Sequence, residues 1–204
     1  MRALAVNINN PRTEKQQNQR SKFAVTINFA KTMTPFLRFG YKEYSGQQTT
    51  FNAAVSYVLK HALKGSGTNV SIDYNKALVT RGSLMPAMDA TVTVSGNKAV
   101  FAWTDNSGMG DAALTDAAML LAYNKDKGMA VYDIAAATRS DAKAELKLPA
   151  NWSDDALAIY LGFCNENATN VANSVCLQDT PVSGDSEGGG SESGGSGRRS
   201  VLRF

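Results

Sequence analysis

The sequence predicts an α+β fold, in which amphipathic N-terminal helices are followed by an immunoglobulin-like, or fibronectin type III-like, β-sandwich. Apolar residues recur at helical spacing up to residue 64 and alternate every second residue from residue 69 onward. The alternating part contains about seven short segments separated by turn residues, which is typical of such a sandwich. We therefore expect a basic helical region at 1–68, a β-sandwich at 69–180, and a disordered Gly/Ser-rich linker with a basic tail at 181–204.

The first helix is predicted to begin between residues 10 and 14. Asn10 can cap a helix that has Pro11 in its first turn, or Thr13 can cap a helix in which Gln16 reaches back. Downstream, apolar side chains spaced four and three residues apart form one stripe, so the helix should be amphipathic. The stripe consists of Phe23, Ile27 and Ala30.

A second helix is expected to run from Thr49 or Thr50 to Leu63. Pro35 should end or kink the first helix, because proline lacks the amide hydrogen and clashes with the preceding turn. Gly65 lies just past the expected end of the second helix, where glycine commonly terminates helices. The residues expected to point inward are Ala54, Val55, Val58, Leu59 and Ala62.

The strands are expected to begin with an alternating segment at 69–74 and a hairpin with arms at 90–94 and 98–104. A Ser-Gly-Asn turn joins the two arms of the hairpin. Further strands are expected at 118–124, 128–134, 143–148, 156–165 and 170–178. Core positions are expected at Phe101, Trp103, Leu121, Tyr123, Leu157, Ile159, Leu161 and Phe163.

The two cysteines, Cys164 and Cys176, fall on the last two predicted strands. If the turn between these strands centres near 167–169, the two Cα atoms are too far apart for a disulfide, so we expect buried free thiols. Two cysteines also exclude a disulfide-knitted miniprotein and a four-thiolate zinc site. The sequence has no run of about 18 apolar residues, so it predicts no membrane-spanning helix.

Charge is distributed unevenly along the chain. Residues 1–64 contain ten Lys and Arg against two acids, whereas residues 65–204 contain eleven against sixteen. Such a split predicts that the N-terminal part faces something acidic, which is the remainder of this protein, a partner surface or nucleic acid. Phe39, Tyr41 and Tyr44 lie near the cations and could stack on bases. The predicted contacts are Arg12, Lys15, Arg20, Lys22, Lys31, Arg38 and Lys42.

The sequence predicts no catalytic, cofactor-binding or metal-binding residues. The single histidine, His61, has no cysteine or acid three or four positions away, so a metal site would need remote ligands. The glycines at 65–67 follow a helix and lack the lysine of a phosphate-binding loop. The polar segment 104–111 could bind calcium, but it lacks the distal glutamate of an EF-hand and is better interpreted as a turn. We therefore predict that the protein is not an enzyme.

The end of the chain has the composition of a tethered peptide. Residues 183–197 are almost entirely Gly and Ser with a few acids, as in a flexible linker. The tail that follows alternates cations with apolar groups and is either incidental or a docking peptide. Its residues are Arg198, Arg199, Val201, Leu202, Arg203 and Phe204.

Five motifs spread over residues 7–178 carry a resemblance to a known family. They are the segments at 10–23, 51–57, 81–84, 103–108 and 172–175. With these motifs the chain resembles an uncharacterised family, a domain of unknown function from Bacteroidota and their mobile elements. The resemblance implies further residues before the first strand-like segment, so we expect the N-terminus to be truncated. Openings similar to 10–23 also suggest phage particles or prophage regions.

Together these features predict a non-enzymatic structural or adhesive interaction module. The expected setting is a virion, a prophage-encoded assembly or a cell surface, with edge strands that could pair between copies in a homo-oligomer or with other structural proteins. One alternative is a nucleic-acid-binding accessory protein that uses the basic N-terminal helix. The other is a carbohydrate-binding module, which would need an exposed aromatic such as Trp152.

Overall fold

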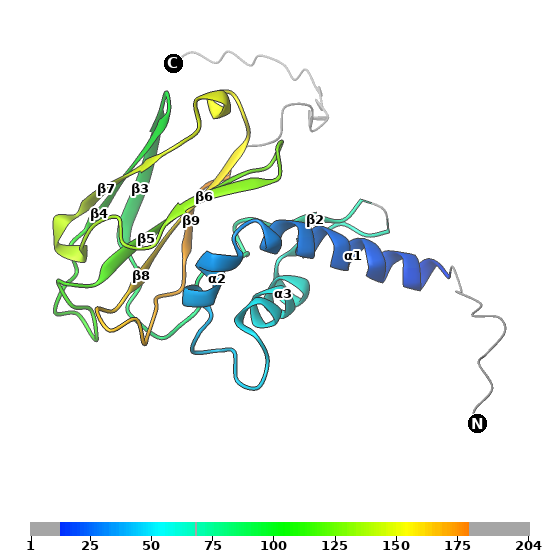
Figure 1. The fold of residues 1–204 in the computed structure, drawn as a ribbon, viewed down its shortest axis with the longest axis horizontal. Helices are drawn as coiled ribbons and strands as arrows, with labels where there is room; N and C mark the ends of the chain where they lie inside the picture. Colours follow the sequence, from blue (N-terminus) through cyan, green and yellow to red (C-terminus); the bar gives the residue numbers. More distant parts are fainter. Residues whose placement is uncertain (1–12, 68, 180–204) are drawn as a thin grey trace, which may run out of the picture.

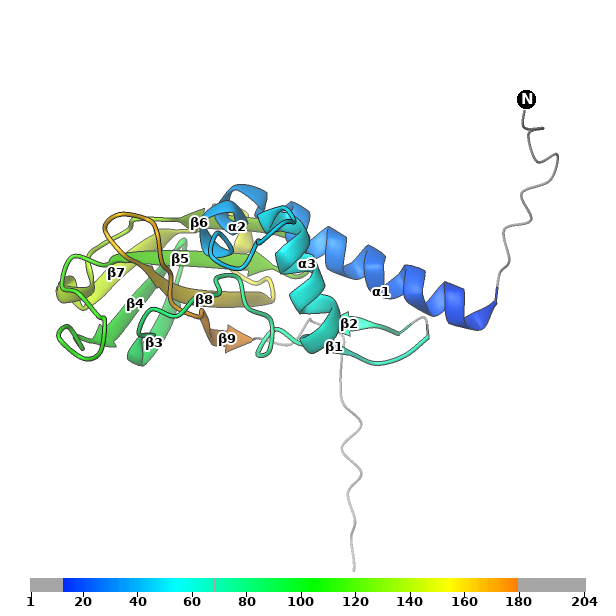
Figure 2. The same ribbon diagram turned by 90° about the horizontal axis from the view of Figure 1, so that it is seen from below.

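The computed structural model describes residues 13–67 and 69–179, which form a mixed α/β structure with helices and antiparallel sheets (Figure 1). The helices are α1 (Glu14–Lys31), α2 (Thr34–Gly40) and α3 (Thr50–His61). They lie beside the sheets, and the outer half of α1 extends away from the body in both ribbon views (Figures 1 and 2). No helix in these two ranges is long and apolar enough to cross a membrane.

The strands form two main antiparallel sheets and one small hairpin. The hairpin pairs β1 (Leu63–Lys64) with β2 (Ser71–Ile72). The three-stranded sheet has the order β3 (Met88–Ser95), β4 (Lys98–Thr104), β7 (Lys143–Lys147). The four-stranded sheet has the order β6 (Met129–Asp133), β5 (Ala117–Asn124), β8 (Leu157–Cys164), β9 (Val175–Asp179). Two short 3-10 helices, Arg139–Asp141 and Ala150–Trp152, flank β7.

The central strands β5 and β8 are buried on both faces. One face packs against the three-stranded sheet, where Phe101 and Trp103 of β4 meet Phe163 of β8 in one apolar cluster. The other face packs against the helices in a second cluster, which includes Leu121 of β5 and Tyr160 of β8. The molecule therefore consists of three layers, a helical layer and two sheets.

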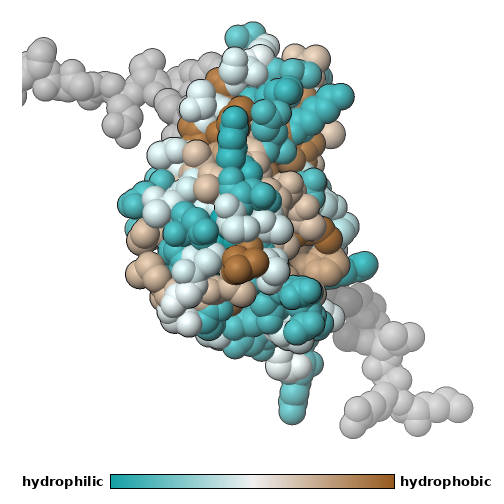
Figure 3. All heavy atoms as spheres, turned by 90° about the vertical axis from the view of Figure 1, so that its left-hand side faces the viewer, coloured by the Kyte–Doolittle hydropathy of each residue, from teal (hydrophilic) through white to brown (hydrophobic). Residues whose placement is uncertain are grey.

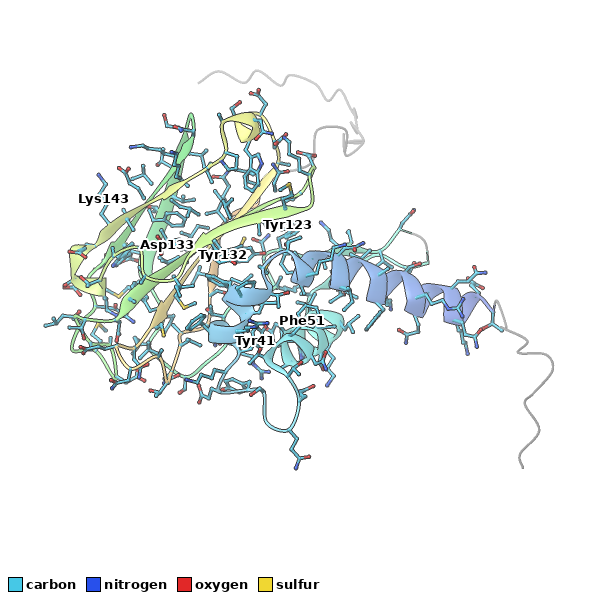
Figure 4. The ribbon with its side chains drawn as sticks, in the orientation of Figure 1. Tyr41, Phe51, Tyr123, Tyr132, Asp133 and Lys143 are labelled. Atoms are coloured by element: carbon cyan, nitrogen blue, oxygen red, sulfur yellow. The ribbon has the colours of Figure 1, made fainter. Side chains whose placement is uncertain are left out.

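Aromatic side chains join the helical layer to the four-stranded sheet. Phe29 of α1 makes an edge contact with Tyr123 at 4.9 Å between ring centroids, and Phe36 of α2 meets Tyr132 at 5.5 Å. Figure 4 shows Tyr123 and Tyr132 where the helices meet the sheet, with Tyr41 and Phe51 nearby at α2 and α3. Edge and tilted ring contacts add to the stabilisation that comes from apolar burial. The helical layer and the sheet thus share one core, while the division into domains near residue 68 stays a prediction.

The predicted helices are confirmed, with differences at their ends. Thr49 caps α3, and its hydroxyl accepts a hydrogen bond from the Asn52 amide at 3.2 Å. Thr13 occupies the cap position of α1 without a side-chain bond, and the Asn10 alternative lies outside the described residues. Pro35 was expected to end or kink the first helix. The helix α1 ends at Lys31, four residues before Pro35, and Pro35 lies in the first turn of the separate helix α2, where no amide hydrogen is needed.

The predicted strands between residues 90 and 165 are confirmed, as is the burial of the expected core residues. The strand predicted at 170–178 begins only at Val175, and residues 171 and 172 form isolated bridges. Leu121 and Tyr123 are buried in a different core from the one between the sheets. They face the helices, while their neighbours Leu120 and Ala122 face the three-stranded sheet. Both cysteines are free; Cys164 is buried and Cys176 is half-buried. In the register of β8 and β9, Cys176 pairs with Tyr160, four residues from Cys164.

A buried arginine joins the loops at one end of the two sheets. The Arg139 Nε donates to the Asp116 carboxylate at 3.0 Å, and both side chains are almost fully excluded from solvent. Its other nitrogens donate to the Asn106 amide oxygen at 2.7 Å and to the Met85 carbonyl at 2.9 Å. The guanidinium also lies 3.9 Å from the Phe163 ring centroid. A buried charge with this many partners is well compensated, so its role is structural.

We expect Asp116→Ala to reduce the free energy of unfolding by about 3–5 kcal/mol, because it leaves the Arg139 charge buried without its counter-ion. Urea denaturation followed by tryptophan fluorescence measures this change. The matched control is Glu145→Ala, which breaks an exposed ion pair with Lys98 and should lower stability far less. Equal effects of the two substitutions would contradict the structural role of Arg139.

Candidate functional site

The cations predicted as contacts are spread over the helical layer. Lys15 and Lys31 are exposed on α1, while Lys22 is half-buried. Lys31 follows Lys22 by nine residues, about two and a half helical turns, so the two side chains lie on opposite faces of α1. Exposed Arg38 lies on α2, and Lys42 donates to the Ala168 carbonyl at 3.1 Å. The helix therefore does not gather these cations into one face. Arg12, Arg198, Arg199, Val201, Leu202, Arg203 and Phe204 lie outside the described residues.

The aromatic residues predicted to stack on bases have different environments. Tyr41 is fully buried and its hydroxyl donates to the Leu78 carbonyl at 2.9 Å, so it cannot contact a ligand at the surface. Phe39 and Tyr44 are 39% and 40% exposed. Trp152 is 2% exposed, so the aromatic named for the carbohydrate-binding alternative cannot contact a sugar at the surface.

An apolar groove lies between α1 and α3. Two adjoining hollows of about 420 and 290 Å³ share Phe23 and Leu59 as lining residues. Phe23 is 54% exposed, although it was expected to lie on the buried stripe with Ile27 and Ala30. The buried face of α1 is instead formed by Thr26, Phe29 and Ala30, which leaves Phe23 at the edge. The other lining residues are Gln19, Arg20, Ala24, Ile27, Asn52, Val55, Ser56 and Lys60.

The groove and the sheets carry opposite charge. In the described part of the chain, residues 13–64 contain eight Lys and Arg against two acids, and the residues from 65 to 179 contain eight against thirteen. The view from the side of the sheets shows hydrophobic residues scattered among hydrophilic ones (Figure 3). The molecule therefore has a basic helical layer with an apolar groove and an acidic body.

A second surface feature forms where the segment 79–84 runs between α2 and the loop before β9. The Arg81 amide donates to the Gly40 carbonyl at 2.7 Å. The Ser174 hydroxyl accepts from the Val79 amide at 2.9 Å, and the Thr80 hydroxyl donates to the Ala172 carbonyl at 2.7 Å. Both sides of the segment are thus fixed, which holds the Arg81 side chain at one place.

The Arg81 side chain lies among aromatic rings from the loop after α2 and from α3. Its guanidinium carbon is 4.2 Å from the Tyr44 ring centroid and 5.1 Å from that of Tyr57. The exposed His61 ring continues the series, 4.8 Å from Tyr57. Sequence reasoning named Tyr44 as a stacking residue but missed Arg81, Tyr57 and His61, although Tyr57 and Arg81 fall in the motifs at 51–57 and 81–84.

The polar segment at 104–111 behaves as a turn. The Asp105 carboxylate accepts hydrogen bonds from the Ser107 amide at 2.9 Å and the Ser107 hydroxyl at 2.5 Å. These bonds hold the pKa of Asp105 below its usual value, because they favour the ionised form. Within the ranges that the structure describes, no group of three or more His, Cys, Asp or Glu is placed to hold a metal ion.

The chain was compared with protein families, curated proteins and solved structures. The profile of a family of unknown function, DUF6266, matches residues 1–178. No curated protein and no solved structure matches the chain. The match is in accord with the resemblance to an uncharacterised domain family, and it ends close to the start of the Gly/Ser-rich tail.

We predict that Tyr41 makes stability sensitive to alkaline pH. Burial raises the pKa of Tyr41 well above its usual value of 10.0, with a smaller increase from Tyr57 and a small decrease from Arg81. Above pH 10 the unfolded chain therefore loses the Tyr41 proton while the folded chain retains it. This contribution to stability is fully present below pH 10 and is lost as the pH rises, by up to about 1.4 kcal/mol per unit.

The measurement is the free energy of unfolding by urea between pH 9 and pH 11, the range set by an ordinary tyrosine pKa of about 10. Tyr41→Phe should be less stable at pH 9 because the bond to Leu78 is lost, but its stability should fall less steeply. Tyr44→Phe, at an exposed position, should keep the wild-type slope. A wild-type slope in Tyr41→Phe would disprove the assignment.

Proposed function

The chain belongs to DUF6266, a family of unknown function, and from its own geometry we propose that it is a non-enzymatic structural or adhesive interaction module. Its binding surface is the apolar groove between α1 and α3. The observation that carries this proposal is the 54% exposure of Phe23 between two apolar hollows, on a helix whose next aromatic side chain, Phe29, is buried. Large aromatic side chains are the common anchors of protein interfaces.

The partner that we propose is a second copy of this chain. A symmetric contact of groove against groove would bring Arg20 and Lys60 of both copies together, and like charges oppose such pairing. A head-to-tail contact instead places the basic helical layer of one copy against the acidic body of the next. Such a contact uses two different surfaces, so it can be repeated along a ring or a filament.

We also propose that the sheets belong to the immunoglobulin-like, fibronectin type III-like class. In a constant-type immunoglobulin domain, strands A, B, E and D form one sheet and strands C, F and G form the other. If β3 to β9 are equated with strands A to G in chain order, the pairing here matches this pattern except at the fourth strand. That strand, β6, pairs with β5 in the four-stranded sheet, whereas the pattern would pair it with β7 in the three-stranded sheet. The Trp103 side chain on the second strand, β4, is in the core between the sheets. Such sandwiches commonly serve as binding modules.

The proposed setting is a virion, a prophage-encoded assembly or a cell surface, and the source organism a member of the Bacteroidota. This proposal rests on the resemblance of the segment at 10–23 to phage-associated openings. Repeated head-to-tail contacts suit such assemblies, because one weak contact is multiplied along the array.

We expect Phe23→Ser to weaken self-association of the full chain about 10- to 100-fold, as burying one aromatic side chain contributes about 1.5–3 kcal/mol. Size-exclusion chromatography with light scattering over a concentration series measures the dissociation constant. The wild-type protein should form larger species, and raising the salt concentration should shift them toward monomer because the faces carry opposite charge.

The matched control is Phe39→Ser, which removes an exposed phenylalanine from α2 outside the groove and should leave the dissociation constant within about twofold. A wild-type protein that stays monomeric at every concentration would refute the proposal. An equal loss in both variants would show that the groove is not the contact.

A further inference from the structure

The guanidinium of Arg81 lacks an oxygen partner in the described part of the chain. The guanidinium carbon lies 4.2 Å from the ring centroid of Tyr44 and 5.1 Å from that of Tyr57. The buried Arg139 offers a contrast within the same molecule, because it rests on Phe163 and also donates to a carboxylate, an amide and carbonyls. Aromatic faces satisfy the charge of an arginine only in part, and its five N–H groups require acceptors.

Neighbouring residues fix the backbone around Arg81, so the segment that carries this side chain cannot shift. The Gly82 amide donates to the Asn173 side-chain oxygen at 3.2 Å. A Cβ at Gly82 would lie 2.0 Å from the Val171 carbonyl oxygen, so only glycine permits this approach. Together with the bond from the Arg81 amide to Gly40, these contacts fix the backbone from which the guanidinium reaches both rings.

The charges around the cluster favour an anion. The helical layer has an excess of six cations over acids between residues 13 and 64. Of the two acids in this layer, Glu43 accepts a hydrogen bond from the Ser83 hydroxyl at 3.4 Å, and Glu14 lies at the outer end of α1. The carboxylate nearest in sequence to Tyr44 is thus turned toward Ser83, and Arg81 forms no ion pair with it.

We propose that Arg81 binds the phosphate of a nucleotide unit, with the base stacked against Tyr44. A guanidinium matches two phosphate oxygens with parallel N–H bonds, which a lysine cannot do. The Tyr44 side chain is 40% exposed, so a planar base can reach the ring that the guanidinium also contacts. A simple carboxylate would use the guanidinium but not the ring, which is why the phosphate of a nucleotide is the better fit.

The phosphate comes either from a free mononucleotide or from single-stranded nucleic acid, and both present the same chemistry to Arg81. This site is separate from the groove and does not depend on self-association. It shares Tyr44 with the stacking residues predicted from the sequence, but its cation is Arg81, which was not among the predicted contacts.

The experiment titrates the full chain at low salt with three probes, which are inorganic phosphate, adenosine monophosphate and a fluorescein-labelled oligothymidylate. Fluorescence anisotropy follows the oligonucleotide, and calorimetry follows the two small probes. Arg81→Gln should weaken binding of the nucleotide probes at least tenfold, and Arg81→Lys should recover only part of the loss. Tyr44→Ala should weaken the nucleotide probes but leave inorganic phosphate unchanged, while Tyr44→Phe should behave as wild type.

The control variant is Arg38→Gln, an exposed cation on α2 whose loss should change affinity about twofold or less. An oligonucleotide that binds at least tenfold more tightly than the mononucleotide identifies a strand as the source, and equal affinities identify the free nucleotide. Absence of binding of all three probes, or wild-type affinity in Arg81→Gln, overturns the proposal. Inorganic phosphate binding as tightly as the mononucleotide overturns the role of Tyr44.

Circular dichroism and the melting temperature verify that each variant is folded. Phe23→Ser should retain nucleotide binding, and Arg81→Gln should retain the wild-type oligomeric state. Failure of the nucleotide site therefore leaves the proposed self-association untouched, and the reverse also holds.

Discussion

The burial of β5 and β8 on both faces is the constraint on which the rest of the structure depends. These two strands must be covered by the three-stranded sheet on one side and by the helices on the other. Each face alone is too apolar to remain in water, since burial of apolar surface is the main stabilising contribution to folding. The helical layer is therefore part of the folded core, and its outer surface is the part left available for contacts.

Polar groups are satisfied in two different ways around this core. Arg139 lies inside the protein and has acceptors on several loops, so it joins segments 85–86, 106 and 116. The segment 79–84 is instead held by hydroxyl and amide side chains from 170–174, together with backbone bonds. The bonds of Arg139 fix the ends of the sheets, and the bonds of segment 79–84 hold Arg81 at the surface of the helical layer.

Much of the fold could be predicted from the period of the apolar residues, because local spacing alone identifies helices and alternating strands. The continuous apolar runs at 117–123 and 157–164 also signal burial on two faces, a feature typical of central strands. The exposure of Phe23 depends on which turn of α1 reaches past the sheet, which spacing does not determine. The Arg81 cluster combines residues 44, 57, 61 and 81, and only the tertiary fold brings these positions together.

The outer half of α1 also determines how the molecule would respond to a pulling force. Its residues 13–20 are largely exposed, while Phe29 near the other end contacts Tyr74 and Tyr123 through ring edges. A pulling force on the outer end of α1 would be transmitted to the sheet through these ring contacts. It would act first on β5, which is hydrogen-bonded to a strand on each side. Because the outer turns of the helix are largely exposed, we expect them to unravel before the hydrogen-bonded sheet yields. The projecting part of α1 would therefore extend under force while the sheet keeps its structure.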